Sequence, residues 1–187
     1  MTNALKLYMV MLGCTPKGRF TEQHDIFFGI GNSLKELVPH MKSFWPEAKG
    51  KIHIDAWREV TTVDGFSITI EPKNASTTKD QLFFINLGGY KENEFEEYHY
   101  KTLAVAGSLG LASKVAKTTT FYKHYSFEGA TSHIDDKYGI DVDDIYNVAD
   151  ILAPIFKDHY SLKITLSEVP LPEDVQHIGY LKIDKIV

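Results

Sequence analysis

Residues 7–34 read LYMVMLGCTPKGRFTEQHDIFFGIGNSL, and the same pattern returns 75 residues later as LFFINLGGYKENEFEEYHYKTLAVAGSL over residues 82–109. The two stretches align without gaps and are identical at 8 of 28 positions. Average composition would give about two identities. The matched residues include glycine, glutamate and histidine besides apolar residues, so shared strand patterning alone does not explain them. The sequence therefore predicts two copies of one small structural unit.

Each copy is expected to contain the elements strand, strand, helix, strand and strand. Apolar runs that suit strands flank a polar, glycine-containing loop, and a serine that can cap a helix follows the second run. In the first copy the strands are expected at 5–12, 23–31, around His53-Ile54-Asp55 and at 66–70, with the helix after Ser33.

The second copy shows the same order with extra material before its last strand. Its strands are expected at 81–87, 98–106, around His133-Ile134-Asp135 and at 162–166, with the helix after Ser108. Residues 142–156 are predicted to form an added helix, in which Asp141 is the N-cap and Asp143 and Asp144 lie in the first turn. Capping explains these carboxylates better than calcium binding, because the glycine and glutamate of a calcium loop are absent.

The predicted fold class is α/β, with an α+β-like arrangement of mixed sheets. A polar linker at 71–80 divides the chain into repeat units 1–75 and 76–187, and a final strand is expected near 180–183. The strand–helix–strand portion of each β-β-α-β-β unit supplies a crossover. Because the strands are apolar on both faces, we expect the other unit to cover the second face, with either two sheets packed together or one continuous sheet and approximate two-fold pseudo-symmetry.

Composition limits the function classes. The chain has 187 residues, of which 43% are hydrophobic, enough for one compact domain or two small ones. Its single cysteine, Cys14, excludes an intramolecular disulfide and a cysteine-based zinc site, and the matching position in the second copy is Gly89. The net charge is −5 without a basic stripe, which argues against binding to nucleic acid.

The first residues, MTNALKLYMVMLG, do not resemble a signal peptide, because they lack a cationic start and a small-residue cleavage site. No apolar run approaches the length of a membrane span. We therefore expect a soluble, cytoplasmic protein without a membrane partner.

The shared polar residues are expected to converge. The first strand of each copy runs into the glycine loop, the second strand starts where that loop ends, and the third begins at the same edge of the sheet. The polar set predicted to cluster in the first copy is Gly13, Glu22, His24, His53 and Asp55, and the corresponding set in the second copy is Gly88, Glu97, His99, His133 and Asp135.

Two interpretations of these clusters stay open. Two histidines and a carboxylate can hold Fe(II), Zn or Mn with open positions, so each copy could bind a divalent metal through His24, His53 and Asp55, or through His99, His133 and Asp135. Alternatively, His24 pairs with Asp55 or with the loop backbone and pins the loop to the sheet. The structural interpretation is favoured, because ligand sites in α/β sheets prefer the carboxyl ends of parallel strands, whereas these residues begin theirs.

The doubled pattern resembles a bacterial family known as domain of unknown function 1543. Its members are similar to this chain in carrying a strand that ends in Leu-Gly, a Glu-x-His and a later His-x-Asp. The matching residues are Leu12, Gly13, Glu22, His24, His53 and Asp55, then Leu87, Gly88, Glu97, His99, His133 and Asp135. The resemblance covers nearly the whole chain and implies no activity, substrate or catalytic residue. Cys14 departs from the Gly-Gly pair expected after the first strand.

The sequence leaves two functions to be distinguished. The first is a duplicated domain without catalysis, which binds a small ligand or a partner or forms a homodimer through an unpaired edge strand. The second is a metal-dependent enzyme with one His/His/Asp site in each copy.

Overall fold

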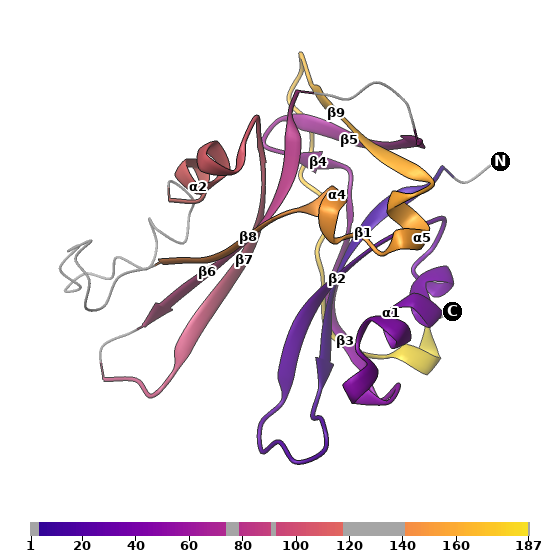
Figure 1. The fold of residues 1–187 in the computed structure, drawn as a ribbon, viewed down its shortest axis with the longest axis vertical. Coiled ribbons are helices and arrows are strands. Elements are labelled where there is room, and N and C mark those ends of the chain that lie inside the picture. Colours follow the sequence, from indigo (N-terminus) through magenta and orange to yellow (C-terminus); the bar gives the residue numbers. More distant parts are fainter. Residues whose placement is uncertain (1–3, 74–78, 91–92, 118–140, 187) are drawn as a thin grey trace. The chain divides into compact units, whose positions relative to one another are not determined.

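The computed structural model describes residues 4–73, 79–90, 93–117 and 141–186. The chain forms two compact units, shown with their elements in Figure 1. The first unit comprises Met1–Thr77 and Leu152–Val187, and the second comprises Thr78–Ile151. Within the described residues the fold is mixed α/β, built mainly from antiparallel sheets. None of the described helices is long and apolar enough to cross a membrane.

A four-stranded sheet carries the N-terminal motif. It has the order β10-β3-β1-β2, and every neighbouring pair is antiparallel. Its strands are β1 (Lys6–Cys14), β2 (Gln23–Gly31), β3 (His53–Val60) and β10 (His177–Lys182). Because β2 and β3 both run opposite to β1, they are parallel to each other with β1 between them. Both strands therefore start at the end of the sheet where β1 finishes.

The connection from β2 to β3 is helical, as the sequence predicted. A 3-10 turn (Lys35–Leu37) leads into α1 (Val38–Phe44), and a second 3-10 turn (Pro46–Ala48) follows. Pro39 lies in the first turn of α1. Backbone N–H groups in this turn have no acceptor within the helix, so the proline removes no helical hydrogen bond. The edge of the Phe44 ring packs on Phe27 of β2 with 5.6 Å between ring centroids, which fixes the helix to the sheet.

A second sheet in the same unit has the order β4-β5-β9. It consists of β4 (Thr62–Val63), β5 (Phe66–Pro72) and β9 (Tyr160–Leu166). The two segments expected as the last strands of separate repeats therefore pair with each other, with Ile68 opposite Ile164.

Residues 152–187 belong with the first unit, which differs from the predicted repeat unit 76–187. The physical reason is pairing, since β9 adds to β5 and β10 adds to β3. The short helix α5 (Pro154–Lys157) buries Phe156, whose ring lies 4.9 Å from that of His40. The Asp174 carboxylate accepts hydrogen bonds from the backbone N–H groups of Thr61 and Thr62 at 3.0 and 3.3 Å.

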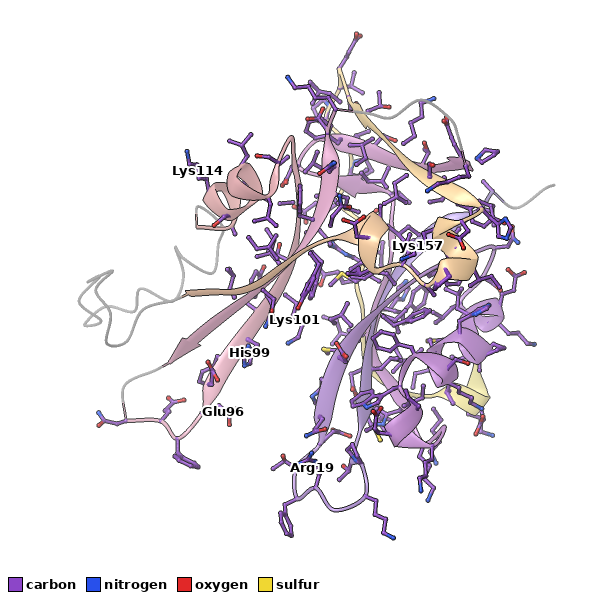
Figure 2. The ribbon with its side chains drawn as sticks, viewed as in Figure 1. Arg19, Glu96, His99, Lys101, Lys114 and Lys157 are labelled. Carbon is purple, nitrogen blue, oxygen red and sulfur yellow. The ribbon has the colours of Figure 1, made fainter. Side chains whose placement is uncertain are left out.

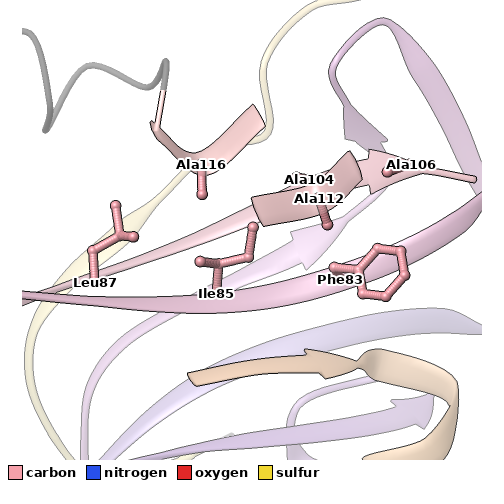
Figure 3. Close-up of a cluster of buried hydrophobic side chains, with 7 residues drawn as sticks. All are labelled: Phe83, Ile85, Leu87, Ala104, Ala106, Ala112 and Ala116. Carbon is pink, nitrogen blue, oxygen red and sulfur yellow. The ribbon is translucent and has the colours of Figure 1, made fainter. Parts of the chain in front are cut away.

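The second unit contains a three-stranded antiparallel sheet of order β7-β6-β8. Its strands are β6 (Gln81–Tyr90), β7 (Glu97–Ala106) and β8 (Asp141–Asn147). Helix α2 (Leu109–Lys117) covers this sheet, and Figure 3 shows its small residues against larger ones on β6. The alanines of α2 and β7 are small, so the helix can approach closely over the larger side chains of β6. The buried cluster consists of Phe83, Ile85, Leu87, Ala104, Ala106, Ala112 and Ala116.

The helix predicted over 142–156 is wrong. Residues 141–147 form strand β8, and only short helices follow, α4 (Val148–Ile151) and α5. An N-cap pattern is a local signal, whereas pairing with β6 satisfies the backbone of the whole segment and suits the β-branched Ile145. His133 and Asp135, expected on the third strand of the second copy, lie outside the described residues.

Candidate functional site

Gly13 lies at the centre of the candidate site. In the pairing of the sheet it faces His24 on β2 and His53 on β3. Residues directly opposite each other on neighbouring strands present their side chains on the same face. The two imidazoles therefore flank a position that has no side chain.

The space above Gly13 is occupied by its neighbours. A Cβ atom at this position would lie 2.3 Å from Nε2 of His53 and 2.4 Å from Oδ2 of Asp55. Contacts this short are not tolerated between non-bonded atoms, so any larger residue would displace both polar groups. The glycine of the first Leu-Gly motif is therefore a requirement of the cluster that lies over it.

A β-bulge places Asp55 beside His53. Leu12 pairs with Ile54 and Met11 pairs with Ala56, so Asp55 is an extra residue in β3 with no partner on β1. Bulges bend a strand and redirect a side chain, and they are common beside functional sites. Simple alternation along the strand predicts Asp55 on the same face as His53, whereas the bulge leaves no signal in the sequence.

The structure brings together Glu22, His24, His53 and Asp55, as the pattern predicted for the first copy. Oδ2 of Asp55 lies 3.3 Å from Nε2 of His24 and 3.2 Å from Nε2 of His53. Oε1 of Glu22 lies 3.1 Å from Nε2 of His53, and its Oε2 lies 3.7 Å from Nε2 of His24. We call these four residues the first-unit cluster.

The first-unit cluster runs from a buried end to an open one. The side chains of His53 and Asp55 are 12% and 21% exposed, whereas those of His24 and Glu22 are 38% and 45% exposed. Two of the buried atoms, Nε2 of His53 and Oδ2 of Asp55, have no hydrogen-bond partner among the described residues. A buried polar atom left without a hydrogen bond costs about 1–3 kcal/mol. Both atoms nevertheless lie at ion-pair distance from charged neighbours, since they are 3.2 Å from each other, Nε2 of His53 is 3.1 Å from Glu22, and Oδ2 of Asp55 is 3.3 Å from His24.

The distances within the first-unit cluster resemble those between ligands of one metal ion. Two ligand atoms at about 2.1 Å from an ion, with an angle of about 90–110° at the ion, are about 3.0–3.4 Å apart. Among the described residues, however, no group of three or more His, Cys, Asp or Glu side chains is arranged so that it could hold a metal ion. The widest separation is that of His24 and Glu22. These are the two most exposed members, which are the most free to rotate toward an ion.

An aromatic ring from β10 covers one side of the first-unit cluster. The Tyr180 ring lies 4.5 Å from that of His53, with 36° between the two planes. Its position follows from an irregularity in the β10–β3 pairing between Ile178 and Leu181, where Gly179 has φ of 136°. The sequence predicts a strand near 180–183 but carries no signal for its pairing with β3, so Tyr180 was not among the predicted site residues.

Cys14 follows Gly13 and is buried. Burial raises the pKa of its thiol, and the nearby charge of Glu22 raises the pKa further. Because nucleophilic and metal-binding cysteines react as thiolates, this position is unsuited to either role.

The second unit repeats part of this geometry. Gly88 faces His99 on β7 and Asp141 on β8. Nε2 of His99 lies 3.7 Å from Oε2 of Glu97, the same separation as between His24 and Glu22. Figure 2 shows His99 on β7. The structure therefore brings together Gly88, His99 and Glu97, while the other two predicted members lie outside its described residues.

The fold and the first-unit cluster define a mixed α/β protein with imidazole and carboxylate groups gathered at one end of an antiparallel sheet. Residues 19–70 match the model of a family described as Domain of Unknown Function (DUF1543). The matched segment includes all four members of the first-unit cluster.

One solved structure with the same fold is that of a protein, Il1583, from Idiomarina loihiensis. It is 24% identical to this chain, with a TM-score of 0.63, and the alignment covers 97% of this chain and 99% of the other. At this identity the similarity shows a shared fold. No curated protein matches the chain.

Proposed function

We propose that the first unit binds a divalent transition-metal ion through His24, His53 and Asp55, and that a small ligand binds at the open positions of this ion. The observation that supports this most directly is the placement of two imidazole nitrogens within 3.3 Å of one carboxylate oxygen. Two of these three atoms are buried and without a hydrogen-bond partner among the described residues.

A purely structural role explains the first-unit cluster less well. A histidine that pins a loop donates its N–H to the acceptor, and the buried carboxylate is then satisfied. His24 has its Nε2 3.3 Å from Oδ2 of Asp55, at the distance that such a pin needs, whereas Nε2 of His53 and Oδ2 of Asp55 stay without a hydrogen bond. An ion lying between them would use the lone pairs of both.

The donor set favours particular metals. Imidazole nitrogen suits Zn, Fe and Mn sites that also contain carboxylate oxygen, whereas Ca²⁺ and Mg²⁺ prefer oxygen alone. Three protein ligands leave positions for water or a substrate, as in catalytic metal sites. Glu22, more exposed and 3.1 Å from His53, is placed to serve as a fourth ligand or to accept a proton from a bound water. A metal-dependent enzyme is thus the function class that this geometry favours.

Metal binding can be measured on protein purified without a histidine tag and stripped with a chelator. We expect Zn²⁺, Mn²⁺ or Fe²⁺ to raise the melting temperature, since an ion at 100 times its Kd stabilises the folded state by about 2.7 kcal/mol. His53→Gln and Asp55→Asn should abolish the shift. His159→Gln, which changes an exposed histidine outside the cluster, is the matched control. A wild-type chain that takes up none of the three metals would exclude the proposal and leave the structural role.

We also infer that the two units descend from one β-β-α-β unit, repeated in tandem. Equal strand registers support this, because His24 and His99 each face the glycine of a Leu-Gly pair across the first hairpin. Both third strands also carry a bulge at the same distance from that glycine. Exchange of residues 7–34 and 82–109 between the units tests the inference, and a chain that no longer folds would contradict it.

A further inference from the structure

Strand β10 extends the row of residues in which the first-unit cluster lies. Lys182 on β10 is directly opposite His53 on β3. His53 in turn is opposite Gly13, which has His24 on its other side. Residues directly opposite each other on antiparallel strands present their side chains on the same face, with Cβ atoms about 4.5–5.5 Å apart. The side chain of Lys182 therefore lies on the face of the first-unit cluster, next to His53.

Tyr180 lies on the same face of β10 as Lys182, because side chains two residues apart in a strand share a face. Its ring centroid is 4.5 Å from that of His53, yet Tyr180 is 65% exposed. The ring therefore covers the histidine with one side and leaves the other side open to solvent. Planar and apolar groups stack on an open aromatic ring of this kind.

The ammonium group of Lys182 has no counter-ion within the described residues. It is exposed and takes part in no ion pair or hydrogen bond there. The carboxylates of the first-unit cluster lie close to imidazole nitrogens instead, since Glu22 and Asp55 are 3.1 and 3.2 Å from Nε2 of His53. The positive charge beside His53 is therefore available to a negatively charged group from outside the chain.

We infer that the ligand of the first unit is a small carboxylate with a planar, apolar body, and that β10 selects it. The inference rests on the proposed function, because an ion held by the cluster would bind a carboxylate oxygen at an open position. The second oxygen would accept a charge-assisted hydrogen bond from the Lys182 ammonium. The planar body would stack on the open side of the Tyr180 ring. Lys182 and Tyr180 are thus specificity-determining residues.

Calorimetric titrations of the full, Zn²⁺-loaded chain with benzoate, benzamide and acetate test this inference. Benzoate has both the charge and the ring, benzamide lacks the charge, and acetate lacks the ring. We expect benzoate to bind more than about tenfold more tightly than benzamide, because only benzoate can pair with the ammonium. Its advantage over acetate should be about fivefold, the contribution of one stacked ring. Equal affinity for benzoate and either of the other two probes would overturn the inference.

Variants of β10 assign the selection to its two residues. Lys182→Met should weaken benzoate binding by about tenfold, and Lys182→Arg should restore most of it. Lys185→Met changes another exposed lysine of the C-terminal segment and should have no effect. Tyr180→Leu should weaken benzoate by about fivefold and leave acetate binding unchanged. A lysine that only protects the sheet edge from other chains would not affect benzoate, and that result would overturn the inference.

The inference and the proposed function can fail separately. Because Lys182 and Tyr180 are exposed and are not proposed ligands of the ion, their variants should bind Zn²⁺ as the wild type does, which also shows that they are folded. A chain that binds Zn²⁺ through His53 but does not bind benzoate retains the proposed function and refutes this inference. A chain that takes up no Zn²⁺ refutes both.

Discussion

The sheets around β1 and β6 share one backbone arrangement and differ in the residues that it carries. Each central strand ends near a glycine flanked by two antiparallel neighbours, and each third strand has a bulge beside it. The flanking residues are His24 and His53 in the first unit, but His99 and Asp141 in the second. Register and bulge therefore bring the same backbone positions together in both sheets, while the residues at these positions differ.

The two units also differ in how their helices pack. Helix α1 of the first unit contributes Met41, which is fully buried, and Phe44 against Phe27. Helix α2 of the second contributes Ala112 and Ala116, which lie directly on β6 (Figure 3). Because alanines add little apolar area, the larger side chains of β6 supply most of the hydrophobic burial in the second unit.

The largest expected effect is that of Ile85→Ala. Ile85 is fully buried in the core of the second unit, and truncation of such a residue costs about 2–5 kcal/mol. Urea unfolding should show the loss, with Ile151→Ala as a control at a partly exposed isoleucine of the same unit. Zn²⁺ binding by the first unit should persist. Simultaneous loss of Zn²⁺ binding and of the second unit's structure would show that the units do not behave as separate cores.

Gly13→Ala should disable the first-unit cluster and lower the free energy of unfolding by about 1–3 kcal/mol, because the new Cβ displaces His53 and Asp55. Gly110→Ala is the control in α2, where a Cβ would meet no atom within 4 Å. That change should stabilise the protein by up to about 1 kcal/mol through helix propensity. Calorimetry with and without Zn²⁺ reports both quantities, and a Gly13→Ala protein that still binds Zn²⁺ would contradict the described geometry.

Tyr8→Phe makes the first unit resemble the second, which has Phe83 at the matching position of β6. Burial, aided by the nearby Glu59, raises the pKa of Tyr8 from 10.0 to about 12. Its folded-state pKa is above the unfolded value, so its contribution is complete below pH 10 and is lost as the pH rises toward 12. The urea midpoint should therefore fall less between pH 8 and pH 11 in the variant than in the wild type. If stability falls equally between these pH values in both proteins, titration of groups other than Tyr8 causes the loss.

Phe20→Ser and Phe95→Ser should have the smallest effects. The two phenylalanines hold matching positions in the two hairpin loops and are 103% and 109% exposed. Exposed side chains without contacts change the free energy of unfolding by about 0.5 kcal/mol or less. Thermal melts of the two variants should match wild type, and a clear loss in one alone would reveal a contact that distinguishes the loops.

Local patterns were sufficient to predict the hairpins and the convergence of Glu22, His24, His53 and Asp55. Apolar runs identified the strands β1, β2, β6 and β7, and the repeated motif pointed to the polar residues beside them. The convergence follows because β2 and β3 both begin where β1 ends. This part of the site depends on residues close to the turns, which local sequence describes well.

Long-range pairing could not be predicted in the same way. The position of Tyr180 depends on β10 joining β3, and the grouping of β9 with β5 joins segments that the repeat had assigned to different copies. Asp141 was interpreted as the N-cap of a helix and Asp143 as part of its first turn, because aspartate is common at helix starts and uncommon in strands. Only the pairing of β8 with β6 distinguishes the two.

The division of the first unit into two segments has a consequence for its synthesis. A ribosome completes Thr78–Ile151 before it makes Leu152–Val187, so the second unit has its whole chain available first. The first unit must wait for β10, and with it the ring of Tyr180 beside His53. Domains that fold during translation do so as their residues emerge. The unit that begins the chain is therefore the one that matures last, and His53 lacks the neighbouring ring of Tyr180 until then.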